Sequence, residues 1–174
     1  MKKNFLVLFA VLVTVLSCNT NSEKIGFVNN SELINTYQEK IDMEAALKLE
    51  IEAFQKRTDS ISQAFQKEAQ GFQIKAQGMK PEAAQAEYQI LGQKQQMLQQ
   101  RIQQEESEIQ QRSQASIDTL IKKVRTFVKD YGKQNGYTFI LGSNEAGSVM
   151  YGKDEYDLTK IIAEALNAAY KEAK

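Results

Sequence analysis

The chain has 174 residues, one cysteine, no histidine and equal numbers of basic and acidic side chains, 22 of each. This composition excludes triads based on histidine, the common His/Cys zinc sites and disulfides within the chain, and no cofactor is expected. A net charge near zero, without clustered positive charge, also argues against a nucleic-acid-binding protein.

The amino terminus has the pattern of a secretory signal. A short cationic segment precedes the apolar run Phe5–Leu16, which is too short to span a bilayer comfortably. The run ends in Val15-Leu16-Ser17-Cys18, which resembles a bacterial lipobox. We therefore expect residues 1–17 to be removed, Cys18 to be lipidated and residues 18–23 to form a tether. The alternative is an ordinary signal peptide followed by an incidental cysteine. Two or more acyl chains would hold the protein at a membrane, and the mature chain would carry 20 basic against 22 acidic side chains.

A short strand is predicted to lead directly into the first helix. Lys24–Val28 is a β-prone run, and the residues that follow it are good helix caps. Asn29 together with Glu32 resembles a capping box. We expect the strand to end and the helix to begin within these few residues.

Residues 31–134 are predicted to form two long helices joined by a tight turn at 78–81. The stretch is rich in Gln, Glu, Lys, Ala and Leu, and its one proline is Pro81. At about 1.5 Å rise per residue, each helix would be on the order of 70 Å long. A compact domain of this size has no internal use for such a length, so the hairpin is expected to project as an arm.

A coiled-coil seam runs along both helices of the arm. Its outgoing members are Leu47, Ile51, Phe54, Thr58, Ile61, Phe65, Glu68, Phe72, Lys75 and Met79, spaced alternately by four and three residues. With a turn near residue 80, positions whose numbers sum to about 160 face each other, so Phe72 would meet Tyr88 and Ile51 would meet Ile109. Since so thin a seam buries little surface, the arm is expected to bend. Gly71 and Gly92 are candidate flexure points, or else tolerated surface glycines.

The remaining segments, 24–30 and 135–174, are predicted to form a small body. Tyr137–Leu141 is the strongest strand, Val149–Tyr151 makes another, and Asp157 caps an amphipathic helix that runs from Leu158 to Ala173. Its predicted apolar face contains Leu158, Ile161, Ile162, Ala165, Leu166 and Ala169. The predicted fold class is α+β: a small three-stranded sheet, a long antiparallel helical hairpin and a C-terminal helix.

This body has too small a core to stand alone with such long limbs, so several copies are expected to share one. The shared residues would be Ile25, Phe27, Val28, Phe139, Leu141, Val149 and Tyr151.

The order of these segments resembles the Skp (OmpH) family of periplasmic chaperones across the whole mature chain. The most specific parts are the strand that starts at Asn135-Gly136-Tyr137, the valine-centred strand at 149–151 and the helix start Asp157-Leu158-Thr159. The resemblance implies a homotrimer with a barrel-like β body and three helical hairpins around a cavity. It also implies a holdase that keeps unfolded outer-membrane β-barrel proteins from aggregating without ATP. Family members are often strongly basic and soluble, whereas this chain is near neutral and predicted to be lipidated.

Candidate contacts for such a client lie in the distal part of the arm. The apolar candidates are Phe65, Phe72, Met79, Tyr88, Leu91 and Met97, and the cationic ones, for anionic groups, are Lys75, Lys80 and Lys94. Internal packing is the alternative role for those on the seam. Lys80 and Met97 lie off the seam or at its end, and no residue is assigned to lipopolysaccharide.

Two other functions remain open from the sequence. One is a lipid-anchored coiled-coil adaptor or spacer that docks to an envelope complex through the hairpin tip. The other is a carboxylate hydrolase, which would need two carboxylates in a rigid cleft. Glu105, Glu106 and Glu108 lie on a solvated helix and offer none, so we expect a protein that is not an enzyme.

Overall fold

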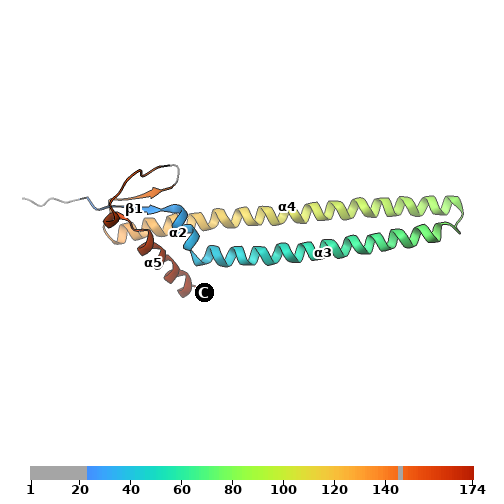
Figure 1. The fold of residues 1–174 in the computed structure, drawn as a ribbon, viewed down its shortest axis with the longest axis horizontal. Helices are drawn as coiled ribbons and strands as arrows, with labels where there is room; N and C mark the ends of the chain where they lie inside the picture. The colour runs from blue at the N-terminus through green and yellow to red at the C-terminus, as the bar shows by residue number, and fades with distance from the viewer. Residues whose placement is uncertain (1–22, 145–146) are drawn as a thin grey trace, which may run out of the picture.

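The computed structural model describes residues 23–144 and 147–174. Two long antiparallel helices project from a small body that holds both strands and the last helix (Figure 1). The elements in chain order are β1 (Ile25–Asn29), α2 (Asn30–Thr36), α3 (Gln38–Ala76), α4 (Pro81–Gln134), β2 (Phe139–Ser143), a 3₁₀ turn (Asp154–Tyr156) and α5 (Thr159–Glu172). The predicted class, a small sheet body with a helical hairpin and a C-terminal helix, is confirmed.

The predicted passage from strand to helix is confirmed at Asn29. Its side-chain oxygen accepts the backbone N–H of Glu32 at 3.1 Å, as expected of an N-cap. The backbone N–H of Asn29 does not complete a capping box, because it donates to Thr159 Oγ1 at 2.8 Å. The cap therefore also ties β1 to the start of α5.

The arm has the predicted turn and the predicted facing of its two helices. Pro81 is the first residue of α4, where its missing N–H is no loss. The rings of Phe72 and Tyr88 meet edge to face with centroids 4.7 Å apart, as predicted. Four ion pairs also join the helices, between Glu39 and Lys123, Glu50 and Arg112, Arg57 and Glu105, and Glu68 and Lys94. Each pair of residue numbers sums to 162, close to the predicted 160.

The outgoing limb contains one break, and each of the two long helices contains a glycine that was predicted to allow bending. The outgoing limb is interrupted at Tyr37, whose extended backbone (φ −75°, ψ 120°) separates α2 from α3; the sequence reading missed this break. Gly71 and Gly92 lie within continuous helix, and a Cβ added at either would meet no atom within 4 Å. Packing requires neither glycine, and their role in bending stays a prediction.

The sheet has two strands in the described chain. The prediction of a third strand at Val149–Tyr151 within this chain is therefore wrong. β1 and β2 pair in parallel, from Ile25 with Phe139 to Asn29 with Ser143. The other edge of β1 is occupied by the start of α5, since the Leu158 N–H donates to the Phe27 carbonyl at 2.9 Å. Residues 149–151 pair with neither β1 nor β2 in the described chain, and Tyr151 is 83% exposed.

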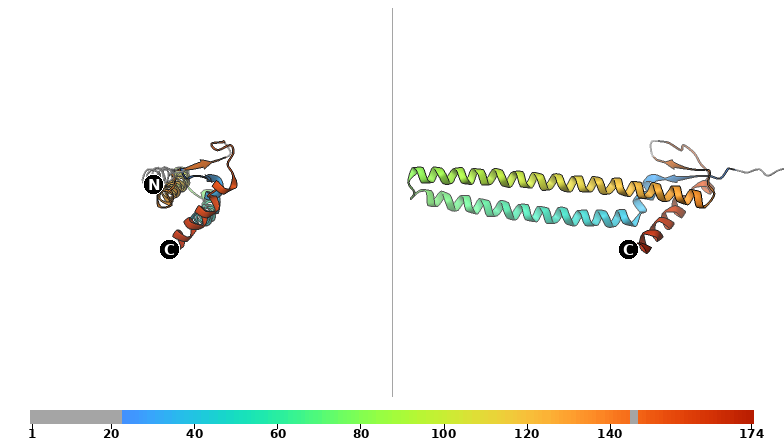
Figure 2. Two further views of the ribbon diagram at one scale, coloured as in Figure 1. Left: turned by 90° about the vertical axis from the view of Figure 1, so that its left-hand side faces the viewer. Right: turned by 180° about the vertical axis from the view of Figure 1, so that it is seen from behind.

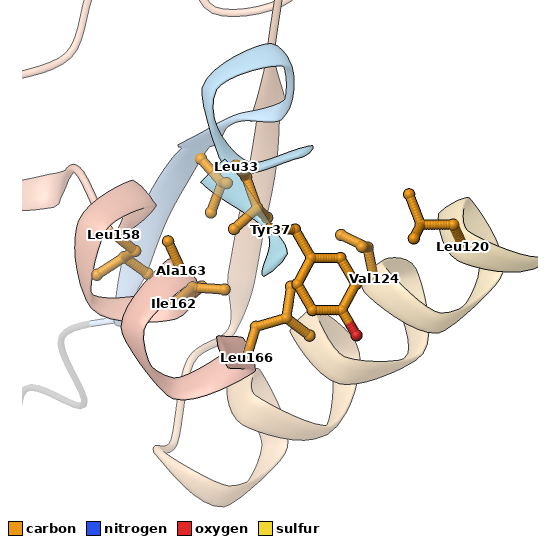
Figure 3. Close-up of a cluster of buried hydrophobic side chains, with 9 residues drawn as sticks. Leu33, Tyr37, Leu120, Val124, Leu158, Ile162, Ala163 and Leu166 are labelled. Carbon is orange, nitrogen blue, oxygen red and sulfur yellow. The ribbon is translucent and has the colours of Figure 1, made fainter. Parts of the chain in front are cut away.

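The core lies where α2, α4 and α5 meet against β1 (Figure 3). Its buried members are Val28, Leu33, Tyr37, Leu120, Val124, Leu158, Ile162, Ala163 and Leu166. The predicted face of α5 is only partly right: Ile161 is 52% exposed and Ala169 is exposed too, whereas Ala163 is buried. α5 also begins one residue later than predicted, at Thr159, whose N–H is accepted by Asp157 Oδ1 at 2.8 Å.

Candidate functional site

The distal arm, residues 61–102, carries the candidate contact residues. It consists of the last turns of α3, the turn and the first turns of α4, and both figures show it far from the body (Figures 1 and 2). Only the other helix supports each helix there. Any side chain that is not on the seam is consequently open to a partner.

The structure separates the apolar candidates into packing and surface groups. Phe72 is only 6% exposed, because it packs against Tyr88. Phe65, Met79 and Leu91 are half-buried along the seam. The exposed candidates are Tyr88 at 54% and Met97 at 64%.

The cationic candidates also divide. Lys94 is engaged by Glu68 across the seam. Lys75 and Lys80 are exposed and, within the described part of the chain, take part in no ion pair. These two lysines are the ones free to meet an anionic group.

Sequence reasoning missed several large apolar side chains that are exposed on the arm. The three most exposed of these are Ile74 at 73%, Ile90 at 57% and, nearer the body, Leu49 at 66%. Each occupies a position off the seam, where a two-helix hairpin gains nothing from an apolar residue. That departure from the seam pattern was the available signal. Ile90 and Met97 are seven residues apart, about two helical turns, and therefore lie on one side of α4.

Two shallow grooves follow the seam of the distal arm. The groove near the tip is lined by Glu68, Phe72, Lys75, Glu87, Ile90 and Leu91 and has a volume of 210 Å³. The second, of 260 Å³, is lined by Ile61, Ser62, Phe65, Gln66, Gln95, Leu98, Gln99 and Ile102. Both are smaller than usual small-molecule sites. Both apolar and polar side chains line them, which suits weak contact with a side chain or two of a larger partner.

The arm carboxylates considered for hydrolysis take part in surface interactions. Glu105 is paired with Arg57, and Glu108 accepts from Gln104 Nε2 at 3.0 Å. In the described ranges, no group of three His, Cys, Asp or Glu side chains is placed to bind a metal ion. The interactions that Glu105 and Glu108 make are an ion pair and a hydrogen bond on the surface.

The body presents a second apolar surface, on the outer face of the sheet. Ile25 pairs with Phe139, and Phe27 with Leu141, so these four residues share one face. Ile25, Phe139 and Leu141 are 40%, 54% and 46% exposed. Val28 points the other way, into the core. Of the predicted shared residues, Val28 is thus internal, Phe27 and Val149 are half-buried, and the remaining four are open.

The lipid-attachment prediction lies outside the described residues, since these begin at Glu23 and do not include Cys18 or most of the tether at 18–23. None of the helices in the described part of the chain combines the length and apolarity needed to cross a bilayer.

Comparison with known proteins gives a family and a similar fold. The family model described as outer membrane protein (OmpH-like) matches residues 24–166. The fold is similar to the crystal structure of a candidate outer membrane chaperone (OmpH-like) from Caulobacter crescentus, with a TM-score of 0.74 and 16% sequence identity. That match covers 84% of this chain and 85% of the other. At such a low identity it shows similarity of fold only. No curated protein matches the chain.

Proposed function

Since the chain belongs to the OmpH-like family of outer membrane proteins, we propose that it is an ATP-independent holdase chaperone of the periplasm. Its clients are unfolded outer-membrane β-barrel proteins, which it holds between several arms and keeps from aggregating. The observation that carries this proposal is the set of exposed apolar side chains on the distal arm, off the seam that holds the arm together.

Holding without ATP follows from many weak contacts. Ile74, Ile90 and Met97 are each more than half exposed, and none lies in a deep pocket that would fix one binding pose. Burying such a side chain against a client is worth about 1 to 2 kcal/mol. Several contacts together hold an unfolded chain, yet each breaks readily. The client leaves when it buries its own apolar surface elsewhere.

The open face of the sheet supports assembly into a homotrimer. Exposed apolar side chains on a two-stranded sheet are unfavourable in a lone chain, and two strands rarely make a stable sheet alone. Residues 149–151 are β-prone and have no partner strand in the described chain. In the assembly they pair with a sheet edge of a neighbouring copy, and the sheet faces bury one another. Three arms then surround one cavity.

Lipid attachment at Cys18, with residues 18–23 as a tether, completes the proposal. β1 lies in the body (Figure 1), and Glu23 and Lys24, the first described residues, directly precede it. An anchor there places the body at the membrane and directs the arms away from it.

An aggregation assay tests the holdase directly. An unfolded outer-membrane β-barrel protein is diluted from denaturant with the full chain at stoichiometric amounts, and light scattering is followed without ATP. We expect scattering to be suppressed. Undiminished scattering would sink the proposal.

A second candidate is an envelope adaptor that docks through the hairpin tip, favoured by the exposure of Ile74 close to that tip. Substitutions at 78–81 separate the two functions. They abolish one specific partnership of an adaptor, whereas a holdase with distributed contacts tolerates them.

A further inference from the structure

The break at Tyr37 leaves backbone groups that neither α2 nor α3 can satisfy. A helix end exposes its last carbonyls, and a helix start exposes its first N–H groups. Tyr37 lies between the two ends and offers no side-chain cap to α3. Its ring is instead buried in the core, 4% exposed, edge-on to Tyr170.

One side chain from the far end of the sequence satisfies both sides of this break. Asn167 Oδ1 accepts the backbone N–H of Gln38 at 2.7 Å, and its Nδ2 donates to the carbonyl of Thr36 at 3.0 Å. A carboxamide carries an acceptor and a donor side by side, so it replaces the helical bonding that the break interrupts.

The end of α5 and Lys174 beyond it also bind the first turns of α3. Tyr170 Oη donates to Asp42 Oδ2 at 3.1 Å, and Lys174 Nζ lies 2.7 Å from the same oxygen. Asn167 and Tyr170 are three residues apart and so share one face of α5, whereas Lys174 follows just beyond the end of the helix. Both ribbon views show the end of α5 beside the start of α3 (Figures 1 and 2).

We infer that Asn167 is a positioning residue. It holds the root of the arm, which is the start of α3, in a fixed orientation against the body. α4 runs from the tip into the body without interruption, whereas the other limb enters the body only through the break at Tyr37. Bending the arm therefore moves the start of α3 against α5, which the Asn167 bridge resists. At about 1.5 Å per residue α3 extends about 58 Å, so a change of about 10° at its root moves the tip by about 10 Å.

The test measures the distance from tip to body in the full chain. Donor and acceptor dyes are attached at p-azidophenylalanine placed at Gln77 and Lys160, and labelled chains are mixed with excess unlabelled chain for single-molecule energy transfer. Asn167→Leu, which removes both hydrogen bonds, is expected to broaden the distribution of distances by up to about 10 Å, the displacement of the tip itself. Asn167→Asp keeps an acceptor for Gln38 but loses the donor to Thr36, and is expected to broaden it less.

Tyr170→Phe is the matched control. It removes a hydrogen bond between α5 and α3 and leaves the break bridged, so its distribution should stay native. A native distribution for folded Asn167→Leu would overturn the inference. If that variant does not fold, a native distribution for Asn167→Asp overturns it equally. The measurement needs no client, so it can fail while the proposed function stands.

Discussion

The carboxylate of Asp42 joins the start of α3 to the end of the chain at Tyr170 and Lys174. The Lys174 ammonium, followed by the Gln38 amide and the Tyr170 hydroxyl, lowers the pKa of this carboxyl from 3.8 to about 2. A lowered pKa in the folded state means that the ionised carboxylate stabilises the fold above pH 3.8, and that this contribution is lost as the pH falls towards 2. Asp42→Asn removes the ionised form at every pH. We therefore expect this variant to be less stable than the native chain at pH 5, with the difference shrinking towards pH 2.

Denaturant unfolding of both proteins between pH 5 and pH 2 checks this expectation. Asp59→Asn is the matched control, because Asp59 is exposed on the same helix and, among the described residues, forms no ion pair. A stability difference for Asp42→Asn that does not change with pH would contradict the role given to the carboxylate.

Residue contacts set by local periodicity could be predicted from the sequence, and those set by distant segments could not. Phe72 meets Tyr88 because both follow from one seam and one turn. The break at Tyr37 could not be seen, because its compensation comes from Asn167, 130 residues away. Ile90 was missed for a different reason. The search for a seam considered only apolar residues at seam positions, and Ile90 lies between two of them.

At the scale of the element, the distal arm is expected to bind through the side of α4 that carries Ile90 and Met97. Replacing both by serine removes exposed apolar surface and leaves the seam intact, so the fold should persist. Loss of both contacts, at about 1 to 2 kcal/mol each, would weaken client binding by at least about thirtyfold. Fluorescence anisotropy with an unfolded β-barrel client measures the dissociation constant.

Leu49→Ser provides the comparison for this prediction, because Leu49 is as exposed as Met97 but lies nearer the body. We expect it to bind clients nearly as the native chain does. Equal affinity of the Ile90 and Met97 double variant and the native protein would show that this side of the arm does not touch clients.

At the scale of the whole molecule, the body explains both what the sequence predicted and where it went wrong. Its small core and apolar strands predicted that several copies of the chain share one core. In the structure, Ile25, Phe139 and Leu141 are exposed on one face of the sheet. The third strand at 149–151 was expected within the chain, but in the described chain these residues pair with neither β1 nor β2. A strand needs a partner as well as β-prone residues, and the sequence of residues 149–151 carries no information about a partner.

Enclosure of a client by several arms requires that the bodies of several copies assemble. The most direct test is the mass of the purified protein in solution, measured by light scattering after size-exclusion chromatography across a range of concentrations. We predict three times the mass of one chain. The mass of a single chain at every concentration would contradict the shared body, the cavity and the enclosure mechanism together.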